Sequence, residues 1–255
     1  SRLIMACRRF TVCVEGNIGC GKSSFIRHFA NKLPGYLNVL EEPVAQWTSL
    51  NNNNLLGMMY SDPKRWCTAF QAYVMLTMSD GHSSSRGASA PPVTLLERSL
   101  HSACRVFVEN LHKQSLMDSM DYHILMEWYN LWVSDQTYDI DVIIYLRAKP
   151  SVCLERVKKR NRSEECDLSL ELLEQLHQLH EDWLINHKFG CPSTRVVVLD
   201  AEQDFDSLMA VYDREVLPIL RDFAGEPAVN GSAESGETDK ENKPNSLVAR
   251  LGVSP

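Results

Sequence analysis

The chain has 255 residues, of which 44% are hydrophobic and 23% are charged, so it can bury a real core in one large domain or two small ones. Its 26 Lys and Arg against 33 Asp and Glu give a net charge of −7, which argues against a protein that coats nucleic acid or a membrane surface. No apolar run approaches the roughly 18 residues of a membrane-spanning helix, so such a span is excluded.

Short apolar segments alternate with segments of helical periodicity along the chain. The expected strands are residues 10–15, 37–42, 93–97, 141–147 and 195–200. The expected helices are residues 22–32, 66–78, 99–113, 122–134, 151–160, 170–187 and 206–222. The strands are apolar without alternation, which is typical of a parallel sheet covered on both faces. The pattern therefore predicts an α/β fold with a doubly wound sheet of five parallel strands.

Three segments fall outside this pattern. Residues 1–9 are basic and free of acid, and are interpreted as a loose N-terminal overhang, with the end of a mitochondrial presequence as the alternative. Residues 79–92, rich in Ser, Gly and Pro, predict a flexible loop. Residues 223–255 hold too little apolar surface to pack and predict a disordered tail, which leaves 10–222 as the folded domain. The eight cysteines include no CxxC pair, so we expect reduced thiols and no zinc site.

A phosphate-binding loop follows the first expected strand. The segment matches G-x-x-x-x-G-K-[ST] and comprises Gly16, Asn17, Ile18, Gly19, Cys20, Gly21, Lys22 and Ser23. In such a loop backbone N–H groups surround phosphate oxygens, the lysine reaches the β- and γ-phosphates, and the Ser hydroxyl binds Mg²⁺. An ordinary glycine-rich turn is the alternative, but the flanking strand and helix favour a nucleoside triphosphate site.

Four further features lie where the acceptor of the phosphate would bind. They are the acids Glu41-Glu42 at the end of the second strand, Glu97-Arg98-Ser99 at the end of the third, the arginines 156, 160 and 162, and Phe70-Gln71 on a helix. Ligands of such sheets bind at the carboxyl ends of the strands. Each feature taken singly is also consistent with a solvated side chain or an ordinary polar contact.

Taken together, these motifs resemble the deoxyribonucleoside kinase family. The resemblance rests on Glu15-Gly-Asn-Ile-Gly, Glu42-Pro-Val, Phe70-Gln71, Glu97-Arg98-Ser99 and the segment 160–165, in order and spaced alike, from about Phe10 to Leu220. It is greatest to the mitochondrial thymidine kinases and the insect multisubstrate enzymes. It implies a P-loop NTPase-type fold with an arginine-rich lid, transfer of the γ-phosphate of ATP to the 5′-hydroxyl of a deoxynucleoside, Mg²⁺, and a homodimer formed through helices flanking the third strand.

The resemblance also implies residue roles. Glu42 would be the general base, kept ionised by Arg98, while Glu97 and Ser23 would place Mg²⁺. Arg156, Arg160 and Arg162 would clamp the triphosphate from the lid. Tyr60 and Glu165 would bond the 3′-hydroxyl, and Gln71 would read the base. The remaining expected contacts are the base walls Trp47, Phe70 and Phe107, the loop residue Ser24, and the adenine-loop residues Asp200, Glu202 and Phe205.

Three apolar positions bear on base preference. Val74, Met78 and Ala103 stand where deoxycytidine kinases of this family place a charged pair around the base. Apolar residues there leave room for the thymine methyl group, so thymidine and deoxycytidine are expected to be favoured over purines. Cys20 and Ser23 depart from the residues usual in relatives but leave the chemistry of the loop intact.

Two other classes compete with this interpretation. A nucleoside monophosphate kinase of the thymidylate type shares the loop and lid, but Glu42 would repel its phosphorylated acceptor. A GTPase-type switch needs Asn-Lys-x-Asp, whereas Asn31-Lys32 is followed by Leu33-Pro34. We expect small-molecule partners only, without nucleic acid or membrane. The expected compartment is the cytoplasm or the mitochondrion, with the cytoplasm favoured and the nucleus left open.

Overall fold

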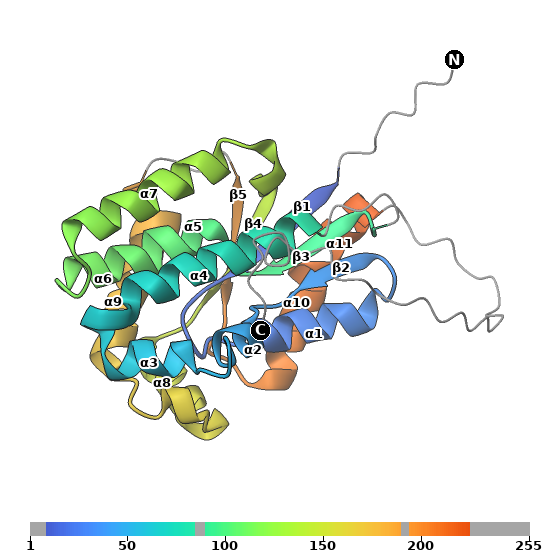
Figure 1. Cartoon of the computed structure of the whole chain (residues 1–255). Coiled ribbons are helices and arrows are strands. Elements are labelled where there is room, and N and C mark those ends of the chain that lie inside the picture. The colour runs from blue at the N-terminus through green and yellow to red at the C-terminus, as the bar shows by residue number, and fades with distance from the viewer. Residues whose placement is uncertain (1–8, 85–89, 190–193, 225–255) are drawn as a thin grey trace, which may run out of the picture.

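The five predicted strands form one parallel sheet in the computed structural model of the protein, which describes residues 9–84, 90–189 and 194–224 (Figure 1). Along the sheet the order is β2-β3-β1-β4-β5. The strands are β1 (Phe10–Glu15), β2 (Leu37–Leu40), β3 (Val93–Glu97), β4 (Val142–Arg147) and β5 (Arg195–Asp200). The predicted α/β fold is confirmed, and the carboxyl ends of β1, β2 and β3 meet at one edge of the sheet.

Helices cover both faces of the sheet because alternate strand residues point to opposite sides. Val12 and Val14 face a core shared with α1 (Lys22–Lys32), α10 (Phe205–Glu215) and α11 (Leu217–Ala224). Cys13 faces the other core, built with α9 (Leu170–Leu184) and a π-helical segment, η1 (Ala103–Val108). This double cover accounts for the unbroken apolar runs of the central strands.

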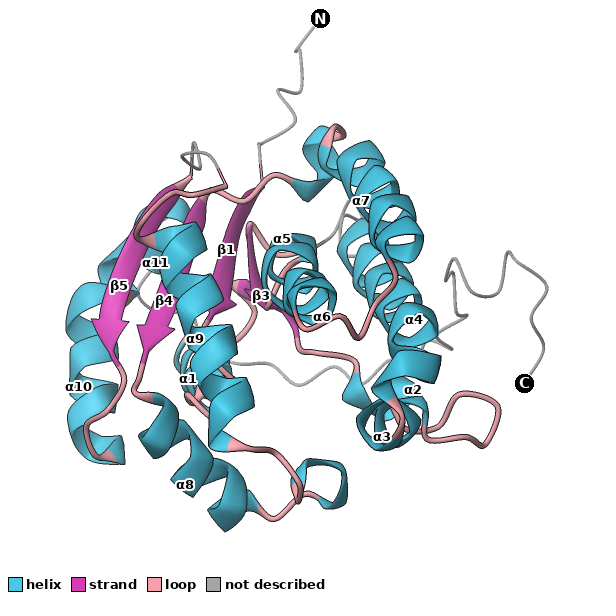
Figure 2. Ribbon diagram, turned by 90° about the vertical axis from the view of Figure 1, so that its left-hand side faces the viewer, coloured by secondary structure: helices cyan, strands magenta, loops and turns pink. Residues whose placement is uncertain are grey.

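A third, purely helical core lies beside the sheet (Figure 2). It is formed by α2 (Val44–Trp47), α3 (Leu55–Ser61), α4 (Pro63–Ser84), α5 (Leu100–Ser102), η1, α6 (Glu109–Lys113) and α7 (Ser119–Val133). The continuous segment α5-η1-α6 lies between α9 on the sheet side and α4 and α7 on the other. It therefore joins the sheet to the helical bundle.

Several predicted boundaries were wrong. Strand β2 ends at Leu40, so Glu41 and Glu42 lie beyond it, and β4 begins one residue later than expected. Helix α4 continues to Ser84, so the loop predicted over 79–92 is wrong for its first six residues, while 85–89 lie outside the described residues. The Ser and His residues there remain helical because Ser79 and His82 are buried, and Ser79 shares a hydrogen bond with the hydroxyl of Tyr138 at 2.7 Å.

The expected helix 206–222 is two helices, α10 and α11, that meet at Val216. Pro218 cannot donate the backbone hydrogen bond that a continuous helix would need, so the chain turns before it. Helix α11 runs to Ala224, two residues past the predicted domain end, and Phe223 stacks on Phe10. The predicted overhang up to residue 8 and the predicted tail from 225 onward lie outside the described residues.

The short elements missed by the sequence analysis are α2, α3, η2 (Gln136–Tyr138) and η3 (Ser163–Glu165). The remaining helix, α8 (Pro150–Arg160), has Pro at its first position, where proline is common in protein helices. None of the helices in the described part of the chain is long and apolar enough to cross a membrane.

Candidate active site

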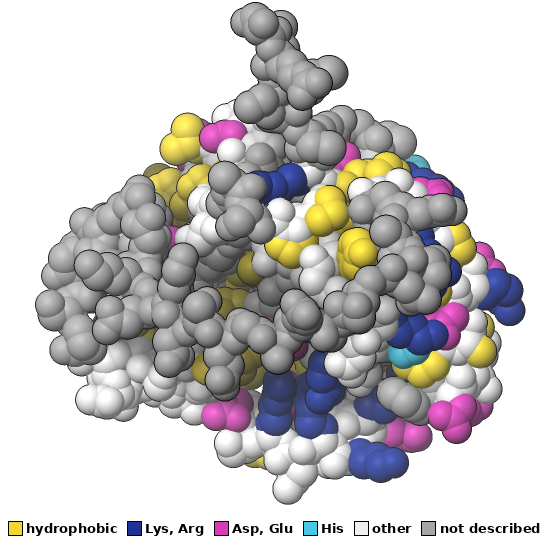
Figure 3. All heavy atoms as spheres, turned by 90° about the vertical axis from the view of Figure 1, so that its right-hand side faces the viewer, with side chains coloured by type: hydrophobic (Ala, Val, Ile, Leu, Met, Phe, Trp, Pro, Cys, Tyr) yellow, Lys and Arg dark blue, Asp and Glu magenta, His cyan; other side chains and the backbone are white. Residues whose placement is uncertain are grey.

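A cavity of about 650 Å³ opens at the carboxyl edge of the sheet, between the sheet and the helical bundle. Its lining comes from the loop before α1, from the strand ends, from α2 to α4, from η1 and from the segment after α8. On the side of the molecule drawn in Figure 3, Lys and Arg side chains gather near the bottom, at the height of α8 in Figure 1. This end of the cavity is therefore suited to a polyanion.

The loop 16–23 has the backbone of a phosphate-binding loop. Gly19 has φ 81°, and a Cβ atom there would lie 2.5 Å from the carbonyl oxygen of Cys153, so a side chain cannot be accommodated. Asn17 fixes the loop on α9, because its Nδ2 donates to the carbonyl of Leu173 at 2.8 Å. Lys22 is buried at the start of α1, and its Nζ donates to the carbonyl of Asn17 at 3.0 Å. Of the predicted loop residues, Ile18, Gly19, Gly21, Lys22, Ser23 and Ser24 line the cavity, whereas Gly16, Asn17 and Cys20 support it from behind.

Ser23 and Glu97, the two predicted metal ligands, lie together. The Ser23 hydroxyl donates to Oε1 of Glu97 at 2.9 Å, although the residues are 74 positions apart in the sequence. Burial and the neighbouring Glu42 raise the pKa of Glu97. Within the described residues no cluster of three or more His, Cys, Asp or Glu side chains could hold a metal ion. One carboxylate and one hydroxyl beside a phosphate loop fit Mg²⁺, which takes few protein ligands and completes its shell with phosphate and water oxygens.

Glu42 and Arg98 form a close ion pair at the centre of the cavity. Nε of Arg98 lies 2.7 Å from Oε1 of Glu42, and Nη1 of Arg98 donates to the carbonyl of Gly16 at 3.0 Å. The guanidinium lies 4.7 Å above the ring of Phe107, in cation–π geometry. Arg98 has φ 63°, a left-handed conformation that is uncommon outside glycine and that concentrates at functional sites. The predicted base and its predicted partner are thus in direct contact.

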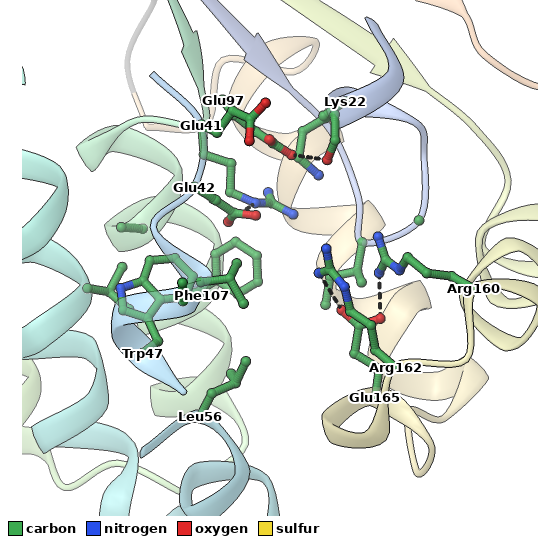
Figure 4. Close-up of a pocket in the computed structure, with 18 of the residues that line it drawn as sticks. Lys22, Glu41, Glu42, Trp47, Leu56, Glu97, Phe107, Arg160, Arg162 and Glu165 are labelled. Atoms are coloured by element: carbon green, nitrogen blue, oxygen red, sulfur yellow. Dashed lines mark hydrogen bonds and ion pairs between the residues drawn. The ribbon is translucent and has the colours of Figure 1, made fainter. Parts of the chain in front are cut away.

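The residues after α8 face the centre of the cavity from the opposite side (Figure 4). Asn161 ends α8 in the left-handed conformation with φ 54°, so the chain reverses between Arg160 and Arg162. Both arginines bond Glu165, at 2.5 Å from Arg160 and 3.5 Å from Arg162. Burial and the charges of Glu165 and Glu42 raise the pKa of Tyr60, which brings this predicted residue into the same group.

The third predicted lid arginine, Arg156, also lines the cavity but contacts backbone rather than the lid carboxylate. Its Nη1 donates to the carbonyl of Ala201 at 2.7 Å and to that of Cys20 at 3.3 Å. It thereby connects the phosphate loop to the segment after β5, where the adenine loop was predicted.

Like Gly16, Asn17 and Cys20, the predicted adenine-loop residues Asp200 and Glu202 do not line the cavity. The carboxylate of Glu202 instead accepts from Nζ of Lys149 at 2.9 Å. Phe205 begins α10.

One face of α4 forms a wall of the cavity at the end where the acceptor was predicted to bind. Gln71, Val74 and Met78 recur at helical spacing on this face, and all three line the cavity. Gln71 is only 3% exposed, and its Oε1 has no hydrogen-bond partner among the residues described. A buried amide oxygen without a partner is costly, so this position calls for a polar ligand group.

Aromatic side chains enclose the same end. Trp47 meets Phe70 edge to face with ring centroids 5.7 Å apart, and its Nε1 donates to the hydroxyl of Thr77 at 3.0 Å. Phe107 and Ala103 complete the enclosure from η1. The sequence analysis expected an ordinary helix here; the π-helical segment has a wider turn and directs both residues into the cavity, as π segments often do at functional sites.

Other lining residues were missed by the sequence analysis. Glu41 and Val44, which the predicted motifs contain without an assigned role, also line the cavity, and the missed residues are Arg27, Ala45, Leu56 and Met59. Two of them lie on α3, whose start is marked by Asn54: its Oδ1 accepts from the backbone N–H of Gly57 at 2.8 Å. An Asn directly before Leu-Leu-Gly-Met-Met is an N-cap signal. The run of four asparagines and the internal glycine concealed it.

Comparison with known proteins identifies the group of sequences to which these features belong. The sequence model of the deoxynucleoside kinase family matches residues 12–219. Human thymidine kinase 2, mitochondrial, is 39% identical over 207 residues, which cover 81% of this chain and 76% of the relative. Human deoxycytidine kinase is 32% identical over 221 residues, covering 76% of this chain and 84% of the relative. Deoxycytidine kinase 1 of Xenopus laevis is 31% identical over 226 residues, with coverage of 78% and 84%.

Proposed function

The chain belongs to the deoxynucleoside kinase family, and from this premise we propose how its residues perform the reaction and which nucleosides it prefers. It is an ATP-dependent enzyme that transfers the γ-phosphate to the 5′-hydroxyl of a deoxynucleoside. One observation carries the residue assignments: the Glu42–Arg98 ion pair lies in the same cavity as Lys22 and the Ser23–Glu97 pair. A proton acceptor thus faces a site for phosphate and metal.

Glu42 acts as the general base. Its carboxylate takes the proton of the 5′-hydroxyl as that oxygen attacks the γ-phosphorus. Arg98 holds this carboxylate by the 2.7 Å contact and stabilises negative charge developing on the reacting oxygens. Because Glu42 would meet a phosphorylated acceptor with like charge, the arrangement favours a nucleoside over a nucleoside monophosphate.

The donor is bound by the phosphate loop and the arginines. Backbone N–H groups of 16–23 and Nζ of Lys22 hold the β- and γ-phosphates, with Arg160 and Arg162 closing over the transferred group. Mg²⁺ would be held by Ser23 and Glu97, and it neutralises phosphate charge when bound. Arg156 orders the segment 200–205 beside the loop, and Asp200, Glu202 and Phe205 form the edge near the adenine.

Thymidine and deoxycytidine are the preferred acceptors. The Gln71 amide can accept from N3–H and donate to O4 of thymine, or pair in the reverse sense with cytosine. Val74, Met78 and Ala103 leave an apolar space for the thymine methyl, and Trp47, Phe70 and Phe107 stack around the ring. Tyr60 and Glu165 bond the 3′-hydroxyl. Because these three positions are apolar, we infer that pyrimidine deoxynucleosides are favoured over purines.

Two copies of the chain associate through α7. Four apolar residues of this helix are exposed: Met120 by 67%, Ile124 by 46%, Trp128 by 44% and Leu131 by 70%. Their spacing places them on one face, and such a face is typical of a subunit interface. The sequence analysis expected the dimer contact on the helices that flank β3. The exposed apolar face places it instead on α7, which packs against those helices. The variant Leu131→Asp should convert the dimer to monomers in light scattering, whereas Glu127→Gln should not.

The folded kinase domain extends from residue 10 to the end of α11. The enzyme works in the cytoplasm or in mitochondria. The similarity to human thymidine kinase 2, a mitochondrial protein, supports the second compartment. Imaging of the C-terminally tagged protein in cells would decide between them.

Incubation with ATP, Mg²⁺ and thymidine tests the central proposal. We expect dTMP and ADP in equal amounts, and a parallel reaction with dTMP as acceptor should give no dTDP. Deoxycytidine should also be phosphorylated, and deoxyguanosine much less. Formation of dTDP without dTMP would instead support a thymidylate-type kinase.

A further inference from the structure

Glu15 is a completely buried acid that the reaction described above does not use. It is the last residue of β1, directly before the phosphate loop, with 0% exposure, and it does not line the cavity. Acidic side chains are almost never fully buried unless they are paired. Leaving this carboxylate inside the protein therefore has to be balanced by the groups around it.

The contacts of Glu15 lead to the segment that carries Arg98. Its Oε1 accepts from the Ser99 hydroxyl at 2.6 Å and from Sγ of Cys13 at 3.3 Å. Ser99 caps α5 with the same hydroxyl, which links the carboxylate to the end of β3. The second oxygen, Oε2, has no hydrogen-bond partner in the described part of the chain. Burial raises the pKa of Glu15, and the charge of Arg98 opposes that rise.

Arg98 is bonded to both neighbours of Glu15. Its backbone N–H donates to the carbonyl of Val14, and its Nη1 donates to the carbonyl of Gly16, each at 3.0 Å. Only 5% of Arg98 is exposed. Its guanidinium therefore lies between the buried end of β1 and Glu42, to which its Nε points.

The reaction itself creates a need for a second carboxylate. When Glu42 accepts the proton of the 5′-hydroxyl, it becomes neutral, and the buried Arg98 cation loses its nearest counter-charge. An uncompensated buried charge is strongly destabilising. Glu97, the other acid nearby, is bonded to Ser23 and lies toward the metal position. Among the described residues, Glu15 is the acid whose charge acts most strongly on Arg98 after Glu42.

We propose that Glu15 is a positioning residue for phosphoryl transfer: through Ser99 and Arg98 it fixes the guanidinium against Glu42 and supplies the counter-charge that remains after Glu42 is protonated. This inference rests on the proposed function of Glu42 as the base. It predicts an effect on the chemical step and not on substrate binding, because the charge of Glu42 changes only during the reaction.

The variant Glu15→Gln removes the charge and keeps the shape. We expect kcat with thymidine to fall by about tenfold to a hundredfold, the range for losing a partner of a charged group. The KM for thymidine and the Kd for ATP should remain within about twofold of wild type, as expected for a group that acts only in the transition state. Cys13→Ala removes the other contact of the same oxygen and should leave kcat unchanged.

Combining Glu15→Gln with Arg98→Ala tests whether the effect of Glu15 depends on Arg98. In Arg98→Ala, adding Glu15→Gln should lower kcat by less than about twofold, because residues acting as one unit are non-additive. Glu15→Asp, which keeps the charge on a shorter side chain, should recover part of the lost activity. If Glu15→Gln does not bind ATP, the test uses Glu15→Asp instead. For that variant we expect a lower kcat than wild type and an unchanged KM for thymidine.

Three results would overturn the proposal: wild-type kcat in Glu15→Gln, wild-type kcat in Glu15→Asp when Glu15→Gln cannot bind ATP, or a full additional loss in the Arg98→Ala background. The last would show that Glu15 acts independently of Arg98. These outcomes are distinct from failure of the proposed function, which would appear as absence of dTMP formation in the wild-type enzyme.

Discussion

The donor and acceptor ends of the cavity are built in different ways. The donor end comes from two short segments that are each continuous in sequence: residues 16–24, which form the loop and the first turn of α1, and residues 160–165, which form the predicted lid. The acceptor end draws single residues from α2, α3, α4 and η1, and is held by the core of the helical bundle. Local backbone geometry therefore defines the donor end, whereas helix packing defines the acceptor end. Changes at the donor end should affect all nucleosides alike, and changes at the acceptor end should alter the choice among them.

The largest effect is expected at the donor end, from Lys22→Ala. Because the proposed role of Lys22 is to bind the phosphates of ATP, the donor common to all acceptors, activity should be lost to the same extent with thymidine and deoxycytidine. Parallel assays of both nucleosides measure this. Lys32→Ala, at the opposite end of α1, is the matched control and should remain active. Unequal losses for the two nucleosides would contradict the division of the cavity into two ends.

The next effect lies where the two ends meet. Glu42→Gln keeps the shape of the side chain but removes the proton acceptor, and losing a general base lowers kcat by about 10²–10⁴-fold. Binding of ATP should persist, because the proposed role of Glu42 is toward the acceptor and not toward ATP. Rapid-quench measurement of dTMP and equilibrium binding of ATP check the two parts separately. Near-normal turnover would exclude Glu42 as the base.

A moderate effect, on the ratio of substrates, is expected at the acceptor end. The double variant Met78→Arg with Ala103→Asp places a charged pair opposite the position of the thymine methyl. Thymidine should lose more than deoxycytidine, so that the ratio of kcat/KM for deoxycytidine over thymidine rises by about tenfold, or roughly 1.4 kcal/mol. Both nucleosides must be assayed on one preparation at saturating ATP. The single variants and the thermal midpoint show whether the pair acts together in a folded protein; an unchanged ratio would place the base elsewhere.

The smallest effect concerns a contact between the two ends. Asn54, which caps α3, donates through Nδ2 to Oε1 of Glu164 in the lid at 2.8 Å. Glu164→Ala should lower kcat/KM for thymidine by about threefold to fivefold, as expected for one partly exposed hydrogen bond.

Asn54→Asp is the matched variant for this contact. It keeps an N-cap acceptor but loses the donor, so its effect should be similar and the two losses should not add. Fully additive losses would show that α3 and the lid are not coupled through this hydrogen bond.

Secondary-structure elements that depend on residues adjacent in the sequence were predictable. The sheet strands, α1 and α8 were located within one residue, except for the carboxyl end of β2, because their signals are apolar runs, a glycine-rich turn and a proline at a helix start. The length of α4 was not predictable, because Ser79 and His82 remain helical only through burial against Tyr138. The π-helical segment likewise depends on packing between two cores and has no signal in the sequence.

By itself the sequence determined the chemistry available at this site: a phosphate loop, acids at the strand ends, and arginines on and just after α8. Only the tertiary structure decided how those groups meet, because contacts such as Ser23–Glu97 and Glu15–Ser99 join residues 74 and 84 positions apart. It also decided that Arg156 contacts backbone and that Glu202 pairs with Lys149 outside the cavity. The physical reason is that a charge's partners are set by which strand ends and helices the cores bring together, and not by its neighbours in the chain.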